Sequence, residues 1–170
     1  MVLEIVLYGH PALRSPGKPV DAIDQRIREL AADMIETMHN AEGVGLAAQQ
    51  VGLPIRMFVL DVRNVPKRPS WMRIAGKKVK YQDHMPMVLI NPEVQTSGEP
   101  EKGVEGCLSL PGVSADVTRP STVRVCGTGV DGQKIEFEAE GLLARAVQHE
   151  LDHLDGILFV QRVVPDELEK

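Results

Sequence analysis

The chain has 170 residues, of which 43% are hydrophobic and 25% charged, and its formal net charge at pH 7 is −5. This length predicts a single domain over 1–170 with a core of its own, and the acidic balance argues against specific DNA binding, which usually requires a basic face. No apolar run approaches the ~20 residues of a membrane span, and no secretory or transit pattern opens the chain, so we expect a cytoplasmic protein, or an organellar one whose transit peptide has been trimmed.

The N-terminal part predicts an extended arm followed by a helix. Glycines and prolines interrupt residues 1–20 and exclude long regular elements there. Over 22–40, apolar residues recur at helical spacing, which predicts an amphipathic helix. Asp21 is the expected N-cap of this helix, and His39 is expected to be a solvated residue at its end.

A short loop with two glycines follows this helix. Gly43 and Gly45 stand one residue apart, and residues without side chains let the backbone approach a ligand closely. No strand precedes them and the third glycine is misplaced, so they do not form a dinucleotide-binding fingerprint. From these residues alone, a tight connection and a wall of an active site are equally good interpretations.

The next segment combines two short strands with a basic stretch. Residues 55–61 and 87–90 are rich in apolar and β-branched residues and predict strands. Between them, residues 62–86 contain seven Lys or Arg residues and several turn formers, which indicates a long exposed loop or hairpin that Trp71 anchors. We favour a solvated loop over a contact with ribosomal RNA.

Cys107 lies in a stretch, 103–112, whose glycines and Pro111 indicate a shaped turn rather than a plain strand. Without a secretion signal, this thiol and that of Cys126 are expected to be reduced. Three roles are open to Cys107: a buried hydrophobe, a nucleophile with a base nearby, or a metal ligand.

The following segment predicts β-structure. Apolar residues alternate with polar ones and indicate strands over 113–117, 122–126 and 135–139, with Cys126 packed in the core. Asp131–Gly132 is a strong hairpin signal between the last two strands.

The clearest pattern in the chain is a helix over 142–155 that carries His149, Glu150 and His153. Histidines at positions i and i+4 lie on one helix face and can bind one metal ion, with the glutamate near a water on that ion. All three residues fall within the apolar arc of the helix, where a titratable group needs a partner. We therefore favour a metal site over two core histidines.

The remaining arc of this helix is polar and is expected to face water. Its members are Arg145, Gln148, Asp152 and Asp155. Gly156 is expected to end the helix, and a short strand or arm over 157–164 to follow it. Together, all these elements predict an α+β fold with antiparallel β-sheets packed around a central metal-binding helix and an amphipathic helix near the N-terminus.

A catalytic ion usually takes three protein ligands and keeps one position open. No histidine follows His153, and no later carboxylate stands at the spacing expected for a metalloprotease ligand. The third ligand is therefore expected upstream, and Cys107 is a better candidate than Cys126.

Three stretches of the chain occur in the order found in peptide deformylases. Gly43–Gln50 resembles G-x-G-x-A-A-x-Q, Glu105–Ser109 resembles E-G-C-x-S, and Gln148–His153 resembles Q-H-E-x-D-H. Every fixed position matches, and the resemblance extends from the first helix to Val164. It implies a metal-dependent hydrolase that removes the N-formyl group from the formylmethionine of newly made polypeptides and releases formate.

The resemblance also implies the site residues. The metal ligands would be Cys107, His149 and His153. The catalytic groups would be Glu150 as general acid and base, with the side-chain amide of Gln50 and the backbone N–H of Leu108 as donors to the substrate carbonyl. An ion pair beside the site would join Glu105 to Arg119, and an apolar methionine pocket would be lined by Val44, Gly45, Leu142 and Ala146.

The implied metal is Fe2+, with Zn2+, Ni2+ or Co2+ as substitutes, because one thiolate and two imidazoles do not themselves select iron. The implied partners are nascent formylmethionyl peptides and the ribosome near its exit tunnel. Two other interpretations are weaker. An endopeptidase would need a third ligand downstream, and a catalytically silent metal-binding module would be expected to have lost Glu150 or Gln50, which are both present.

Overall fold

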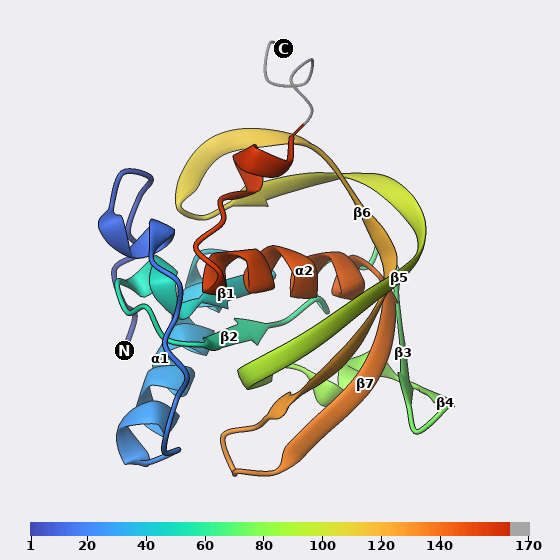
Figure 1. Ribbon diagram of the computed structural model, residues 1–170, viewed down its shortest axis with the longest axis horizontal. Coiled ribbons are helices and arrows are strands. Elements are labelled where there is room, and N and C mark those ends of the chain that lie inside the picture. The colour runs from blue at the N-terminus through green and yellow to red at the C-terminus, as the bar shows by residue number, and fades with distance from the viewer. Residues whose placement is uncertain (164–170) are drawn as a thin grey trace.

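The computed structural model describes residues 1–163, and in it one helix lies inside a curled sheet (Figure 1). The helices are α1 (Gln25–Asn40) and α2 (Leu142–Leu154). The strands are β1 (Gly45–Ala47), β2 (Met57–Leu60), β3 (Ser70–Ile74), β4 (Lys77–Val79), β5 (Met87–Cys107), β6 (Leu110–Thr128) and β7 (Lys134–Gly141). The short 3-10 helices are η1 (Pro11–Arg14), η2 (Ala48–Val51), η3 (Tyr81–His84) and η4 (Phe159–Arg162).

The strands form one seven-stranded sheet in the order β1-β2-β5-β6-β7-β3-β4, and every pairing between these strands is antiparallel. Figure 1 shows this sheet bending around α2, while α1 packs outside β1 and β2. The predicted α+β fold with a central helix and an N-terminal helix is therefore confirmed.

The β5–β6 hairpin is much longer than the sequence predicted. Each strand runs through positions where prolines and glycines indicated a break, so the strand predicted over 87–90 continues to Cys107, and 113–117 and 122–126 belong to one strand. Shifts in register at three places absorb these residues, because a bulge accommodates a proline that cannot pair. The hairpin arches over α2 (Figure 1), and Cys107, the last residue of β5, contacts His153 of that helix.

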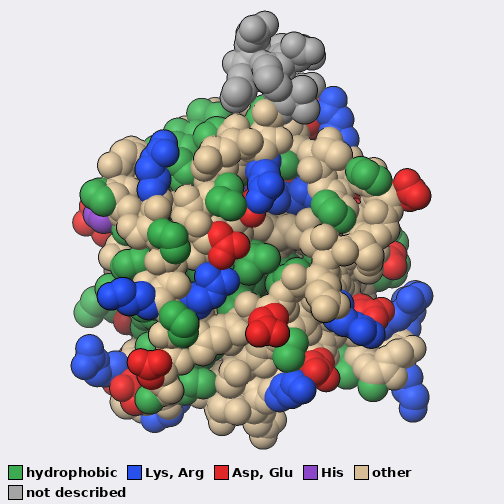
Figure 2. Space-filling view, in the orientation of Figure 1, with side chains coloured by type: hydrophobic (Ala, Val, Ile, Leu, Met, Phe, Trp, Pro, Cys, Tyr) green, Lys and Arg blue, Asp and Glu red, His purple; other side chains and the backbone are tan. Residues whose placement is uncertain are grey.

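The basic stretch 62–86 is more ordered than a loop. It contains β3 and β4, joined by the two-residue turn Ala75–Gly76, in which both residues have positive φ. Trp71 is 45% exposed, so the prediction that it anchors this segment is wrong. Basic and acidic side chains are interspersed on the face shown in Figure 2, and β3 pairs with the acidic strand β7.

Other boundaries also differ from the predictions. The N-cap of α1 is Asp24, not Asp21, and its carboxylate accepts from the N–H of Ile27 at 3.1 Å. Residues 157–163 contain a 3-10 helix rather than a strand, with one bridge from Val163 to β6. Val164 lies outside the described residues. Cys126 is only partly buried and donates to Glu136 at 3.7 Å, so it is not a core residue.

Two apolar clusters hold the layers together. One lies between α2 and the inner face of the sheet and includes Phe58 and Leu60 of β2. The other lies between α1 and the opposite face and includes Met57 and Val59 of the same strand. Because β2 is buried on both faces, it reads as a continuous apolar run. Within the described residues, no helix is long and apolar enough to cross a membrane.

The prediction of a solvated polar arc on α2 is wrong for three of its four members, whereas Asp155, just after the helix, is exposed. Arg145, Gln148 and Asp152 are all buried, with at most 9% of each residue exposed. The β5–β6 hairpin covers this arc and supplies polar partners for it, so α2 is enclosed on nearly every side. Gly156 has φ +75° just after the helix, which confirms it as the residue that ends α2.

Candidate active site

Three metal-ligating side chains meet beside α2. His149 and His153 are one helical turn apart, and Cys107 reaches them from the end of β5. One ligand atom from each of the three lies within 4.8 Å of the others. The Cys107 Sγ is 3.4 Å from the His153 Nε2. The two histidines of α2 and Cys107, which was favoured over Cys126, thus form a group that could hold one ion.

The environment of the histidines fits metal binding. His149 Nδ1 lies 2.8 Å from Glu105 Oε1, which leaves the other ring nitrogen for a metal, and such a carboxylate partner is the usual support for a ligating histidine. Burial, together with the neighbouring His149, lowers the pKa of His153 to about 3 and keeps its ring neutral. One sulfur and two imidazole nitrogens are a donor set that suits Fe2+, Zn2+ or related divalent ions.

Glu150 lies beside this group as a buried carboxylate with spare hydrogen-bonding capacity. It is 3% exposed, and its Oε1 has no hydrogen-bond partner among the described residues. Burial raises its pKa to about 7, although the adjacent His149 acts in the opposite direction. A carboxyl group with a pKa near the working pH can both accept and return a proton.

Gly45 makes room for this carboxylate. A Cβ added at position 45 would lie 2.5 Å from Glu150 Oε2. The close approach explains why the loop carries glycine here, and it favours the active-site interpretation of Gly43 and Gly45 over that of a mere connection. Gly43 serves the same wall, since a Cβ there would lie 2.8 Å from the side chain of Leu108.

The amide of Gln50 also faces the site. Its Oε1 accepts from the backbone N–H of Ala47 at 3.0 Å, which directs Nε2 toward Cys107 Sγ at 3.5 Å and Ser109 Oγ at 3.3 Å. Gln49 points away from it, toward the carbonyl of Leu154. The structure therefore places Gln50, and not its neighbour, where an amide N–H could donate to a substrate.

A cavity of about 490 Å³ opens beside these groups. All four residues predicted for an apolar pocket line it: Val44, Gly45, Leu142 and Ala146. Leu108, Glu150 and His149 line it as well. Ile5 of the N-terminal arm and Leu110 also line the cavity. Neither was predicted, because their positions depend on contacts between residues that are far apart in the chain.

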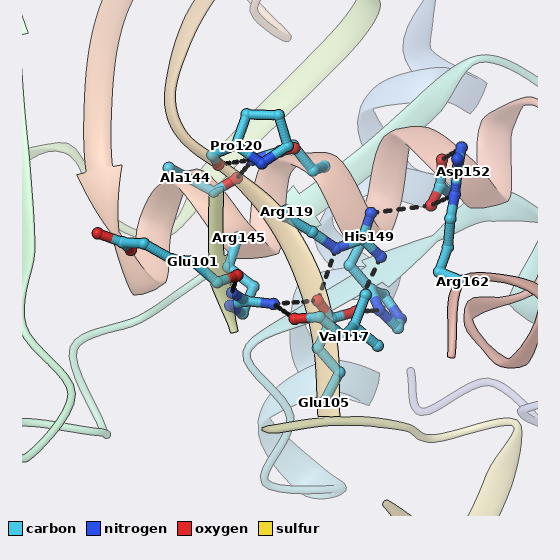
Figure 3. A network of polar contacts seen from close by, with 11 residues as sticks. Glu101, Glu105, Val117, Arg119, Pro120, Ala144, Arg145, His149, Asp152 and Arg162 are labelled. Carbon is cyan, nitrogen blue, oxygen red and sulfur yellow. Dashed lines mark hydrogen bonds and ion pairs between the residues drawn. The ribbon is translucent and has the colours of Figure 1, made fainter. Parts of the chain in front are cut away.

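A buried network of charges supports His149 (Figure 3). Arg119 binds both oxygens of Glu105, at 2.6 and 2.9 Å, as the predicted ion pair requires, and it also reaches Asp152 at 3.0 Å. Arg145 donates to the same Glu105 carboxylate at 2.8 Å. Burial alone would raise the pKa of Glu105, but hydrogen bonds from Arg119 and His149 outweigh burial and hold the pKa well below its usual range.

Arg145 and Asp152 were expected to face water, so their part in this network was not predicted. One available signal was Gly103, a glycine inside a strand with no turn to make. A Cβ at that position would lie 2.8 Å from the Arg145 guanidinium carbon. Such a glycine indicates that another group approaches the backbone closely.

Comparisons with known proteins agree with this arrangement. A family model described as polypeptide deformylase matches residues 2–169. The chain belongs to the peptide deformylase family. A peptide deformylase from Methylacidiphilum infernorum is 44% identical over 100% of this chain and 93% of its own length. One from Dictyoglomus thermophilum is 44% identical over 99% of this chain and 97% of its own length.

Solved deformylase structures show the same fold. The Thermotoga maritima enzyme superposes with a TM-score of 0.81 at 37% identity, covering 97% of this chain and 99% of that one. The Synechococcus elongatus enzyme, solved in complex with actinonin, gives a TM-score of 0.83 at 40% identity over 98% of this chain and 82% of that one. Members of this family are hydrolases that remove the N-formyl group from nascent peptides, so this chain is a deformylase enzyme.

Proposed function

We propose that this deformylase works with a single divalent ion, Fe2+ in the cell, held by Cys107, His149 and His153. The observation that carries this proposal is the meeting of these three side chains with the buried, partly unpaired carboxylate of Glu150 at the wall of an apolar cavity. When bound, the ion would supply Lewis acidity, which makes water a better nucleophile near neutral pH and polarises a carbonyl.

Glu150 is the general acid and base in this proposal. Its carboxylate accepts a proton from the attacking water, whose oxygen forms the new bond to the formyl carbon. The same carboxyl group then returns the proton to the amine nitrogen as the C–N bond breaks, and formate and a free N-terminus result. The pKa of about 7 suits both steps, because the group changes protonation state easily near neutrality.

Two donors stabilise the negative charge that develops on the formyl oxygen. Gln50 Nε2 is held toward the site by the bond between its Oε1 and the Ala47 N–H. The backbone N–H of Leu108 follows Cys107 directly in the chain, and Leu108 lines the cavity. One such donor typically contributes ~3 kcal/mol to the stability of the transition state.

The methionine side chain of the substrate occupies the cavity against Val44, Gly45, Leu142 and Ala146. These residues are apolar or small, which suits an unbranched thioether side chain. Nascent formylmethionyl peptides emerge from the ribosome, so we place the enzyme near the exit tunnel, in bacterial cytoplasm or in an organelle that makes formylated proteins. The whole chain would form one catalytic domain.

The test is formate release from a short formyl-methionyl peptide by enzyme loaded anaerobically with Fe2+ or Ni2+. The wild type should release formate, and Glu150→Gln should reduce kcat by ~10²–10⁴-fold while the metal content stays unchanged. An acetylated peptide and an unformylated internal peptide serve as comparison substrates. No formate from metal-loaded wild type, or cleavage of the internal peptide instead, would refute the proposal.

A further inference from the structure

We propose that Arg145 is a positioning residue for this reaction: it fixes the Glu105 carboxylate, and through that carboxylate the ring of His149, in the orientation that metal binding requires. The inference rests on the proposed role of His149 as a metal ligand. It concerns a residue whose position on a helix predicted solvent exposure and whose side chain is instead enclosed beside the site.

Among the described residues, every hydrogen bond of the Arg145 guanidinium ends on the β5–β6 hairpin. Nη1 donates to Glu105 Oε2 and to the carbonyl of Val117, each at 2.8 Å, and Nη2 donates to the carbonyl of Glu101 at 2.8 Å (Figure 3). Glu101 and Glu105 belong to β5 and Val117 to β6. One side chain of α2 therefore ties the helix to both strands that cover it.

The Glu105 carboxylate is shared in an ordered way. Its Oε1 is 2.8 Å from His149 Nδ1 and accepts from Arg119, while its Oε2 accepts from Arg119 and Arg145. Arg119 belongs to β6 and reaches α2 through Asp152, whereas Arg145 itself lies on α2, about one helical turn before His149. Arg145 thus binds the carboxylate directly from the helix that carries the ligand.

This arrangement closes a ring on one turn of α2. The helix backbone joins Arg145 to His149, and the Glu105 carboxylate joins their side chains. With Arg119 alone, the arginines would tie the carboxylate to the helix only indirectly, through the bond from Arg119 to Asp152. With both arginines, the position of the carboxylate is fixed relative to the histidine ring that it orients.

Gly103 completes the arrangement. It pairs with Val117 across the hairpin, at the place where the guanidinium crosses the strands. A Cβ at position 103 would lie 2.8 Å from both Cζ and Nε of Arg145 and 3.0 Å from Nη2. The missing side chain at position 103 therefore leaves the space that the guanidinium occupies, and Gly103 and Arg145 form a complementary pair.

A purely structural role of Arg145 would have different measurable consequences. Arg145 would then only stabilise the packing of the hairpin on α2, and replacing it would change the free energy of unfolding without changing the metal site. A role only as part of the cavity wall, which Arg145 also lines, would change KM alone. The positioning role instead predicts a change in metal affinity and in the His149 hydrogen bond.

The experiment compares the wild type with Arg145→Met, Arg145→Lys and Gly103→Ala. Arg124→Met is the matched control, because Arg124 lies on the same hairpin and pairs with a carboxylate, Glu138, but is largely exposed and far from the site along β6. Three quantities are measured: the affinity for Zn2+ by chelator competition, the 1H NMR resonance of the His149 Nδ1–H in zinc-loaded protein, and kcat and KM for formate release.

We expect Arg145→Met to weaken Zn2+ binding and to lower kcat about 10-fold each, the lower end of the effect of removing an outer partner of a metal ligand. The Nδ1–H resonance should shift or exchange faster. Arg145→Lys should recover part of the loss, and Gly103→Ala, which keeps every charge, should reproduce it. Arg124→Met should match the wild type in all three measurements.

Unchanged Zn2+ affinity and an unchanged Nδ1–H resonance in Arg145→Met would overturn the proposal, and so would a rise in KM alone. If Arg145→Met does not fold, Gly103→Ala decides by the same measurements. Absence of formate release from the wild type would refute the proposed function instead. The two failures are distinguishable because metal affinity and the NMR resonance are read without turnover.

Discussion

Replacing Gly45 by alanine should separate the general base from the metal site. The added Cβ would lie 2.5 Å from Glu150 Oε2, and ordinary contact begins at 3.4 Å, so the carboxylate must retreat by about 0.9 Å. Because the obstructing atoms, Oε2 at 2.5 Å, Cδ at 2.9 Å and Cγ at 3.0 Å, all belong to the flexible side chain of Glu150, the fold can accommodate the change. Gly45 does not have a positive φ, so alanine causes no backbone strain there.

A misplacement of about 1 Å at a reacting group can reduce the rate on the order of 10²-fold. We therefore expect Gly45→Ala to lower kcat about 100-fold while the content of Fe2+ or Ni2+, the circular dichroism spectrum and the melting temperature remain close to those of the wild type. The assay is formate release from a formyl-methionyl peptide by anaerobically loaded enzyme, at saturating substrate.

The same substitution in a Glu150→Asp background tests whether the alanine acts through the Glu150 carboxylate. Glu150→Asp shortens the side chain by one methylene and withdraws the carboxylate from position 45, so adding Gly45→Ala to it should cost much less than 100-fold. Equal losses in the two backgrounds would show that the alanine acts elsewhere, for example on the bound peptide. Full activity of Gly45→Ala would show that the position of Glu150 is not critical for catalysis.

Three further predictions concern stability and the metal. Burial would raise the pKa of Asp61, but hydrogen bonds from Arg63 and His39 outweigh burial and lower this pKa to about 2 from 3.8. The stabilisation of the fold by this carboxylate is therefore complete above about pH 4 and is lost as the pH falls toward 2. In urea unfolding, Asp61→Asn should remove on the order of 2 kcal/mol of that pH dependence. Ala75 has φ +52° in a two-residue hairpin turn that favours Asn. Ala75→Asn should therefore stabilise the fold by about 0.5 kcal/mol and raise the midpoint of urea unfolding. An unchanged or lower midpoint would contradict this prediction. The Fe2+ enzyme should lose activity in air as Cys107 is oxidised, measured by intact mass and formate release, whereas retained activity with an unmodified thiol would argue against iron.

Local patterns in the sequence predicted the parts of the site that lie on one element. The spacing of His149 and His153 follows directly from helix geometry, and so does the position of Glu150 beside them. Strand alternation likewise predicted the strand over 135–139, which lies within β7, where Phe137 and Ala139 are buried. These inferences succeed because a short repeat determines which side chains point the same way.

Contacts between distant elements were harder to predict. His39 is exposed, as expected, but the sequence did not show that its Nε2 lies 2.8 Å from Asp61, which directly follows β2. Prolines and glycines made the β5–β6 hairpin look like separate pieces, since propensity does not show where a bulge will absorb a proline. In both cases the deciding partner lies on another element.

The error about the polar arc of α2 has a specific physical cause. An amphipathic pattern indicates a wet face only if one face of the helix reaches solvent, and here the curled sheet and its long hairpin enclose the helix. Buried charges then require partners of opposite sign. Glu105 and Asp152 meet Arg119 and Arg145 in that role, so the charged residues of the arc indicate where the hairpin lies.

This interpretation makes the charges of the hairpin and of the helix depend on each other. Removing Arg119 would leave Asp152 with Arg162 and Glu105 with Arg145. Removing the charge of Glu105 would leave Arg145 with no carboxylate and Arg119 with Asp152 alone, and it would give His149 Nδ1 a neutral acceptor in place of a charged one. Glu105→Gln should therefore weaken Zn2+ binding more than either Arg145→Met or Arg119→Met does, since an uncompensated buried charge costs more than a lost pair. If Glu105→Gln bound Zn2+ as tightly as the arginine variants, the carboxylate would not be the link between the charged arc of α2 and the metal ligand.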